Sequence, residues 1–306
     1  MIKEEFEFQK IENYLNEKVD LLIGGIPNEE ERSQFFAAKW TEQKKDLLLF
    51  QQIKGTEKVR RQVYISGILI VNDEIDITFG IPKTLQENRV EKRNVLLDLS
   101  GLEHVLIMFL TKVLVKQVVP ELLFASYVRP ECYIGTEGEP LALSLVNDIQ
   151  GVKAVPGFVK RTQENVTLCT FVGFEGMRLK GIIESLNVEK LVSVTAFPCD
   201  DLNWYNTAIR NSAYFEDMGI EHTRHKCSSE SIFNAIDLLR EFLPNARTSI
   251  LVPIGTRPHS MACAIYASHC NNVNLIFDHA VESTNRTQGV KGITIYHLSQ
   301  FLSIKY

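Results

Sequence analysis

Signatures of the common catalytic and cofactor sites are missing from this chain of 306 residues. Its six cysteines show no C-x-x-C spacing, which excludes the usual zinc-ribbon and thioredoxin-like patterns. No P-loop of the G-x-x-x-x-G-K-[ST] type occurs, and no G-x-S-x-G nucleophile turn. The sequence therefore names no reaction, and function has to be inferred from fold and from the chemistry of a few loops.

Long apolar runs are also missing. The longest, from Val105 to Val119, is interrupted by Lys112 and Lys116, whereas a membrane span needs about 20 apolar residues. The first residues are acidic and contain neither the basic nor the apolar block of a signal peptide. Cys169 and Cys263 fall inside apolar patterns, where a reduced thiol packs as a small hydrophobe. We therefore expect a cytoplasmic protein that has no contact with membranes.

The chain has little excess charge of either sign. Its formal net charge is −5, which argues against general nucleic-acid binding, since proteins that coat nucleic acids usually carry a basic face. Hydrophobic residues make up 45% of the sequence and charged residues 23%, close to the globular average. A globular chain of this length is long enough for about two domains.

Apolar, β-branched segments alternate with helical patterns along the whole sequence, which predicts an α/β fold with mostly parallel sheets. We expect two tandem Rossmann-like modules, residues 1–150 and 151–306, with the junction in the glycine-rich region 135–165. Residues 63–71 and 75–79, joined by Asn-Asp-Glu, predict a β-hairpin inserted in the first module.

The two halves resemble each other in three places. Residues 24–32 correspond to 173–178, residues 96–104 to 251–259, and residues 123–131 to 275–283. Each pair occupies the same position in the strand–helix alternation. Two unrelated α/β modules would also produce this rhythm, so the sequence leaves internal duplication open.

Ligands of parallel α/β sheets bind at the carboxyl ends of strands, where helix N-termini supply N–H groups without partners. This rule selects the loops 24–32, 98–104, 173–178 and 255–260. The last two carry the donors expected for an anion. The candidate ligand-binding residues are Gly255, Thr256, Arg257, His259, Ser260, Gly173, Gly176 and Arg178. The alternative is structural: glycine and proline end a strand here, and Thr256 caps a helix.

Two acidic residues near these loops are candidates for catalysis. Glu175 stands where the dinucleotide fingerprint has its second glycine, which disfavours NAD binding, and it could act as a base or simply pair with Arg178. Asp200, with Asp201, could serve as an acid or base or hold Mg²⁺, or the pair could cap a helix. Whether the protein is an enzyme stays open, and no cofactor is indicated.

A metal site is not expected. Residues 222–227 contain two histidines and a cysteine, but no second ligand pair follows at a familiar spacing, so we interpret them as a surface loop. A cysteine nucleophile is disfavoured because no histidine can be shown to lie beside Cys199 or Cys227. The polar segment 283–289 is expected to cover the ligand crevice as a lid.

The turn Pro253-Ile-Gly-Thr-Arg-Pro-His-Ser-Met261 resembles the Gly-Gly-Thr-Lys motif of CARF domains, the Rossmann-like sensors of cyclic oligoadenylates in prokaryotic antiviral systems. The resemblance covers about thirty residues, with Ile254 in place of the first glycine and Arg257 in place of the lysine. It implies that Gly255, Thr256 and Arg257 touch a nucleotide and that the protein dimerises. The nuclease or DNA-binding domain that usually accompanies such sensors is not recognisable here.

Three functions remain open from the sequence. The leading hypothesis is a prokaryotic regulatory protein, in a defence setting, that binds a nucleotide or other small phosphorylated ligand with Arg257 as the anion clamp. The second is a nucleotide or nucleoside hydrolase or transferase that uses Glu175 or Asp200. The third is a non-catalytic interaction subunit of a multi-protein complex.

Overall fold

A computed structural model describes residues 4–134, 146–149, 153–158, 166–174, 178–243, 248–277, 280–282 and 286–302. The chain divides into two compact units. The first consists of Met1–Ile134 and Thr284–Tyr306, and the second of Gly135–Ser283. The sequence analysis placed the domain boundary at residue 150 and assigned all later residues to the second domain, which differs from this division. Residues 146–149 group with the second unit, and residues 286–302 belong to the first.

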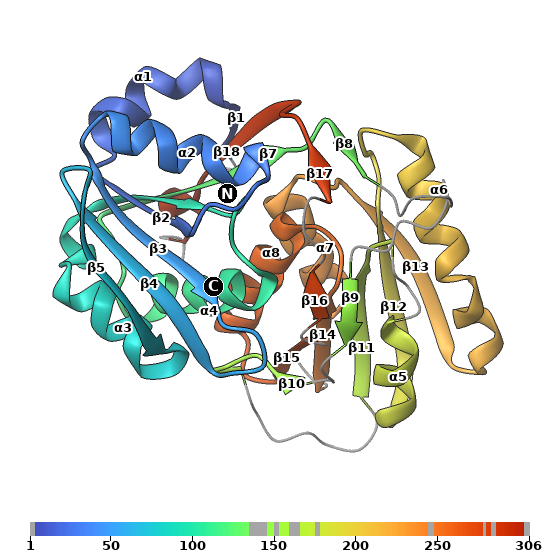
Figure 1. The fold of residues 1–306 in the computed structure, drawn as a ribbon. Coiled ribbons are helices and arrows are strands. Elements are labelled where there is room, and N and C mark those ends of the chain that lie inside the picture. The colour runs from blue at the N-terminus through green and yellow to red at the C-terminus, as the bar shows by residue number, and fades with distance from the viewer. Residues whose placement is uncertain are drawn as a thin grey trace. The chain divides into compact units, whose positions relative to one another are not determined.

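An eight-stranded sheet forms the centre of the first unit (Figure 1). In sheet order its strands are β1 (Glu4–Glu7), β18 (Gly292–His297), β7 (Leu122–Arg129), β6 (Asn94–Asp98), β2 (Leu21–Gly25), β3 (Asp46–Gln52), β4 (Lys58–Ile65) and β5 (Ile68–Asp76). The four strands from β7 to β3 are parallel, and the pairs on either side of them are antiparallel. The C-terminal segment belongs to this unit because β18 pairs with both β1 and β7.

Helices cover both faces of this sheet. The helices are α1 (Phe8–Lys18), α2 (Glu31–Glu42), α3 (Ile77–Glu87), α4 (His104–Lys116) and α9 (Leu298–Leu302), with a 3₁₀ turn, η1 (Val90–Lys92). Phe8, Leu15, Phe36 and Trp40 of α1 and α2 pack with Leu22 and other strand residues in one core. Right-handed crossovers on the two sides of β2 place α2 and α4 on opposite faces. The almost wholly apolar α4 is accordingly buried along most of its length.

The predicted hairpin exists, but its turn was placed wrongly. The turn consists of Ser66 and Gly67, both with positive φ, and β5 continues through residues 72–74, where the turn was expected. Positive φ at both central residues is typical of a type I′ hairpin, whose twist matches that of its strands. The apolar pattern on both sides of Ser66 concealed the turn. Ile77–Phe79, predicted as strand, begin α3 instead.

The second unit has a six-stranded sheet. Its strands, in sheet order, are β10 (Lys153–Ala154), β15 (Val273–Phe277), β14 (Ser249–Pro253), β11 (Val166–Val172), β12 (Val188–Ala196) and β13 (Glu221–Cys227). All neighbours except β10 and β15 are parallel. The helices are α5 (Arg178–Ser185), α6 (Leu202–Asn211), the 3₁₀ helix η2 (Ala213–Met218), α7 (Ile232–Phe242) and α8 (Arg257–His269). Within this unit α5 and α6 lie on one face of the sheet, and α7 and α8 on the other (Figure 1).

Two small ribbons complete the described structure, β9 (Val146–Ile149) with β16 (Ala280–Glu282), and β8 (Cys132–Tyr133) with β17 (Thr287–Gln288). The predicted α/β class is confirmed. Residues 222–227, expected as a surface loop, form β13 and pair with β12 along their length, so that prediction was wrong. Among the described residues no helix is long and apolar enough to span a membrane.

Candidate functional site

The strand order of the second unit changes direction between β11 and β14. From β11 the chain proceeds through β12 to β13, then crosses back and continues outward through β14 to β15. At such a switch point the connections leave toward opposite faces, and the carboxyl ends of the two strands leave room for a ligand. The loops that follow β11 and β14 begin at Gly173 and Ile254, so the structure brings two of the predicted loops together here.

Gly173 and Gly255 meet at this switch point. A Cβ atom on Gly173 would lie 2.5 Å from the carbonyl oxygen of Ile254 and 3.5 Å from the Cα of Gly255. A Cβ on Gly255 would lie 3.1 Å from Nδ1 of His259 and 3.2 Å from the carbonyl oxygen of Phe171. Packing alone therefore requires glycine at position 173 and makes a side chain at position 255 crowded, so both glycines have a structural role.

Helix α8 begins beside this contact, with Thr256 as N-cap residue and Pro258 in the first turn, as predicted. The Thr256 hydroxyl does not cap the helix, however. It donates to the carbonyl of Ser229 at 2.7 Å, in the crossover that follows β13. Gly255 and Thr256 are half-buried, whereas Arg257 is 7% exposed and His259 and Ser260 are fully buried. Of the predicted residues in this turn, Gly255 and Thr256 therefore lie nearest to solvent.

His259 connects α8 to the same crossover. Its Nε2 lies 2.8 Å from the carbonyl oxygen of Ser228, so Nε2 carries the proton and Nδ1 is an acceptor. No donor among the described residues reaches Nδ1, although that atom is buried. The ring packs on Phe171, with 4.6 Å between ring centroids. Burial lowers the pKa of His259 to about 4, so the imidazole is neutral at physiological pH and cannot hold an anion by charge.

The remaining predicted ligand residues have different surroundings. The Ser260 hydroxyl faces the carbonyl of Pro253 at 3.4 Å, inside the unit. The guanidinium of Arg178, at the start of α5, lies 5.6 Å from the centroid of the Phe277 ring. Gly176 and the catalytic candidate Glu175 lie outside the described residues.

Polar and aromatic side chains gather where β12 and β13 end. Asp201 caps α6 by accepting a hydrogen bond from the backbone N–H of Asn203 at 2.8 Å, as the structural alternative proposed, and Asp200 is half-buried beside it. The ammonium of Lys226 lies 4.9 Å from the Phe197 ring centroid and 5.0 Å from that of Tyr205. This cation–π group was missed because its members are separated by up to about thirty residues in sequence.

Neither a metal cluster nor a lowered pKa at Cys169 or Cys199 is found in the part of the chain that the structure describes. Those residues contain no cluster of three or more His, Cys, Asp or Glu side chains that could hold a metal ion. Burial raises the pKa of the Cys199 thiol, and it raises that of Cys169 to about 12. Nucleophilic cysteines need a lowered pKa, so neither Cys169 nor Cys199 has the environment of an activated thiol.

The first unit has a similar switch point, between β2 and β6. A Cβ on Gly25 would lie 2.0 Å from the carbonyl oxygen of Gly101, so two glycine turns meet here as well. The buried carboxylate of Asp98 accepts hydrogen bonds from the hydroxyls of Ser100 at 2.7 Å and Ser126 at 3.1 Å. These polar groups at the end of β6 satisfy one another within the fold.

A buried ion cluster stands beside this second switch point. Arg32 donates from Nε to the carboxylate of Glu30 at 2.8 Å, and both side chains are almost completely buried. Glu30 also accepts from the Thr287 hydroxyl at 2.8 Å and lies 3.5 Å from Nε of Arg286. The described part of the predicted 283–289 lid, residues 286–289, is thus bound to the start of α2 within the first unit. No sequence signal pointed to this cluster, because its partners are about 250 residues apart.

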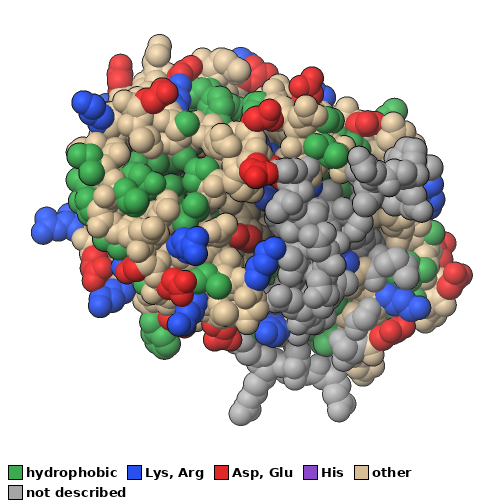
Figure 2. Space-filling model, viewed as in Figure 1, with side chains coloured by type: hydrophobic (Ala, Val, Ile, Leu, Met, Phe, Trp, Pro, Cys, Tyr) green, Lys and Arg blue, Asp and Glu red, His purple; other side chains and the backbone are tan. Residues whose placement is uncertain are grey.

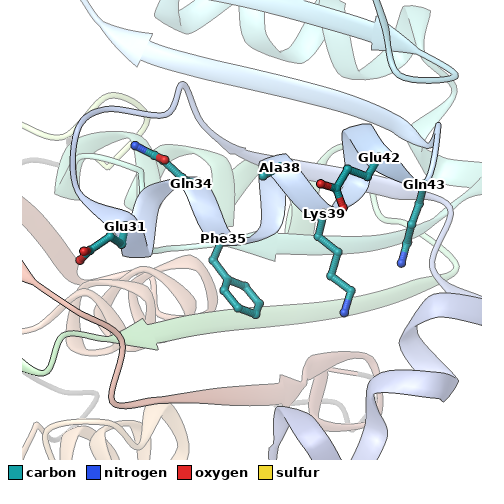
Figure 3. A pocket seen from close by; sticks show the side chains of 7 residues that line it. All are labelled: Glu31, Gln34, Phe35, Ala38, Lys39, Glu42 and Gln43. Atoms are coloured by element: carbon teal, nitrogen blue, oxygen red, sulfur yellow. The ribbon is translucent and has the colours of Figure 1, made fainter.

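A shallow groove of about 540 Å³ runs along α2, lined by side chains of that helix and by Gln43 (Figure 3). Phe35 and Lys39 point to the same side of the helix (Figure 3). The Lys39 ammonium binds Glu12 and lies over the Phe8 ring, so it serves the packing of α1 on α2. The polar side chains that line the groove do not converge on a common point, as they would in a small-molecule site (Figure 3).

Known proteins offer little comparison. No protein family matches the sequence, and no curated protein does. A solved structure described as a "Type III CRISPR defence DNA nuclease activated by cyclic oligoadenylate" aligns with 75% of this chain at 14% identity and a TM-score of 0.29. The chain covers 38% of that nuclease chain's length. A TM-score of this size does not establish a shared fold.

Proposed function

We propose that the second unit binds a nucleotide or another small phosphorylated ligand at the carboxyl edge of its sheet, where α8 begins. The observation that carries the proposal is the meeting of the Gly173 and Gly255 turns at the switch point, directly before the N-terminus of a 13-residue helix. The first N–H groups of a helix have no partner within the helix, and its dipole favours an anion there.

The predicted residues have different roles in ligand binding. The half-buried Gly255 and Thr256 stand at the opening and contact the ligand through backbone N–H groups. Arg257 is buried at the first helical position, where its charge attracts the anion at short range. His259 and Ser260 act as positioning residues, because their polar atoms bind the backbone carbonyls of Ser228 and Pro253.

The CARF-like turn at residues 253–261 gives the proposal a biological setting. A ligand-binding regulatory protein of a prokaryotic defence system fits this resemblance, and cyclic oligoadenylates therefore belong among the ligands to be tested. The aromatic side chains near Lys226, at the ends of β12 and β13, would provide surfaces for a base on the same edge of the sheet.

A thermal-stability screen tests the proposal directly. The protein is melted with inorganic phosphate and with mono-, di-, cyclic and oligonucleotides, beside Arg257→Ala and the control Arg240→Ala on α7. We expect stabilisation by one ligand class, which Arg257→Ala abolishes and the control retains. Absence of any shift across the panel would contradict the proposal and favour an interaction subunit, whereas a shift that survives Arg257→Ala would contradict the assigned binding site.

A further inference from the structure

The start of α2 is buried and has no side-chain cap. Its N-cap residue, Glu30, accepts no hydrogen bond from the first turn with its carboxylate, and Glu30, Arg32 and Ser33 are all buried. The Cβ of Ser33 lies 3.5 Å from the position that a Cβ on Gly101 would occupy, so the helix begins at the glycine contact of the first unit. A helix end that is buried without a cap leaves backbone N–H groups that need an acceptor.

The carboxylate of the N-cap residue cannot be that acceptor, because other donors occupy it. Oε2 of Glu30 accepts from Nε of Arg32 and from the Thr287 hydroxyl, each at 2.8 Å. Oε1 accepts from the backbone N–H of Arg286 at 3.3 Å and lies 3.5 Å from Nε of the same residue. Two guanidinium groups, a hydroxyl and a backbone N–H therefore converge on one carboxylate.

One nitrogen beside this carboxylate has no acceptor. Nη2 of Arg32 is buried, and no hydrogen-bond partner reaches it among the described residues. Burial lowers the pKa of Arg32, but Tyr133 and Glu30 raise it by more, so the guanidinium keeps its charge. A buried charged donor without an acceptor is costly, and native folds rarely leave one unsatisfied. The arrangement therefore requires an acceptor that the protein itself does not supply.

Burial and charge together indicate the class of that acceptor. The side chains of Arg32, Glu30 and Arg286 are 2%, 4% and 8% exposed, which is too little access for a nucleotide or another organic group. A water molecule would accept from the N–H groups but would add no charge. A halide ion accepts several hydrogen bonds and also carries the negative charge that a guanidinium and the positive end of a helix favour.

We propose that the first unit binds a chloride ion between Nη2 of Arg32 and the N-terminus of α2. The ion replaces the missing cap of the helix, and the Glu30 carboxylate beside it holds residues 286–287 against the same helix end. The proposal concerns the first unit only and is independent of ligand binding in the second.

Urea unfolding in chloride and in gluconate tests the proposal. The full chain carries Trp204→Phe, so that the fluorescence of Trp40 reports the first unit. Both potassium salts are used at the same ionic strength, and gluconate is too large for the buried position. We expect the equilibrium constant for unfolding to fall at least about tenfold when about 0.5 M gluconate is replaced by chloride.

Two charge-conserving variants locate the ion. Arg32→Lys keeps a cation beside Glu30 but removes Nη2, so chloride should then change the equilibrium constant for unfolding less than about twofold. The matched control is Arg93→Lys, at a more exposed arginine that pairs with Asp20, and it should retain the full effect. Acidic and basic side chains are interspersed over the visible face of the first unit, so general screening should act equally on both variants (Figure 2).

Equal stability of the chain with Arg32 in both salts would overturn the proposal, and so would a chloride effect that Arg32→Lys retains in full. A crystal of the wild-type chain grown with bromide gives a test that does not depend on the folding of a variant. Its anomalous density should place bromide within hydrogen-bond distance of Nη2 of Arg32. A water molecule or no density at that position would overturn the proposal as well.

Discussion

The neutral, buried His259 makes the stability of the second unit depend on pH. Its pKa falls from 6.5 to about 4 because burial disfavours the charged imidazole, despite the hydrogen bond to Ser228. In the unfolded chain the imidazole binds a proton near pH 6.5, so the unfolded state takes up more protons below that pH. The stabilisation is therefore complete above pH 6.5 and is lost as the pH falls toward 4.

The size of this effect follows from the two pKa values. The full difference corresponds to about 3 kcal/mol, and between pH 7 and pH 5 about 2 kcal/mol of the free energy of unfolding is lost. His259→Gln removes the titration but keeps an N–H that can reach the Ser228 carbonyl. The variant should be less stable than the wild type at pH 7. At pH 5 the difference between their free energies of unfolding should be smaller by about 2 kcal/mol.

The two tryptophans make the measurement specific to one unit. Trp40 lies in the core of the first unit and Trp204 on α6 of the second, and the sequence contains no others. Urea unfolding is followed through Trp204 in a Trp40→Phe background, at pH 7 and pH 5, for the chain with His259 and with His259→Gln. Equal losses of stability in both chains between the two pH values would show that His259 does not cause the pH dependence.

Two further predictions concern the first unit, and Trp40 fluorescence during urea unfolding measures both. Gly25→Ala should destabilise the unit by about 3 kcal/mol or more, because the new Cβ would overlap the Gly101 carbonyl. In the control Gly24→Ala the new Cβ would meet only ordinary contacts, so this variant should cost less than about 1 kcal/mol. Equal effects would contradict the close approach of the two turns. Glu30→Ala should cost about 3 kcal/mol, since it leaves Arg32 buried without its carboxylate, and a loss below about 1 kcal/mol would show that this ion pair is not buried in solution.

Local patterns predicted much of the fold. The β-branched and leucine-rich runs that became β2, β3, β6 and β14 are buried on both faces of parallel sheets, and such strands are apolar along their whole length. The glycines after them marked the loops at the carboxyl edge. These signals need only a few neighbouring residues, so they are readable in a single sequence.

What the sequence concealed depends on partners far along the chain. β1 was not expected because its Glu-rich residues become a strand only by pairing with β18, about 290 residues later. The polar β13 was interpreted as a loop, since an edge strand with little apolar burial lacks the usual pattern. At the candidate site the turn and the helix start were predicted correctly. The burial of Arg257, His259 and Ser260 was not predicted, because it depends on the crossover at Ser228 and Ser229.

Anion binding at the start of α8 can be tested with a pair of variants at Thr256. Thr256→Asp and Thr256→Asn both supply a good N-cap side chain, but only aspartate adds a negative charge at the opening. A charge about 5 Å from a phosphate should weaken binding at least about tenfold after solvent screening.

The measurement is calorimetric titration of the best ligand from the panel into both variants. We expect a dissociation constant close to the wild-type value for Thr256→Asn and at least about tenfold higher for Thr256→Asp. Equal affinities for the two variants would contradict this expectation, because they would show that the ligand does not bind at this helix N-terminus.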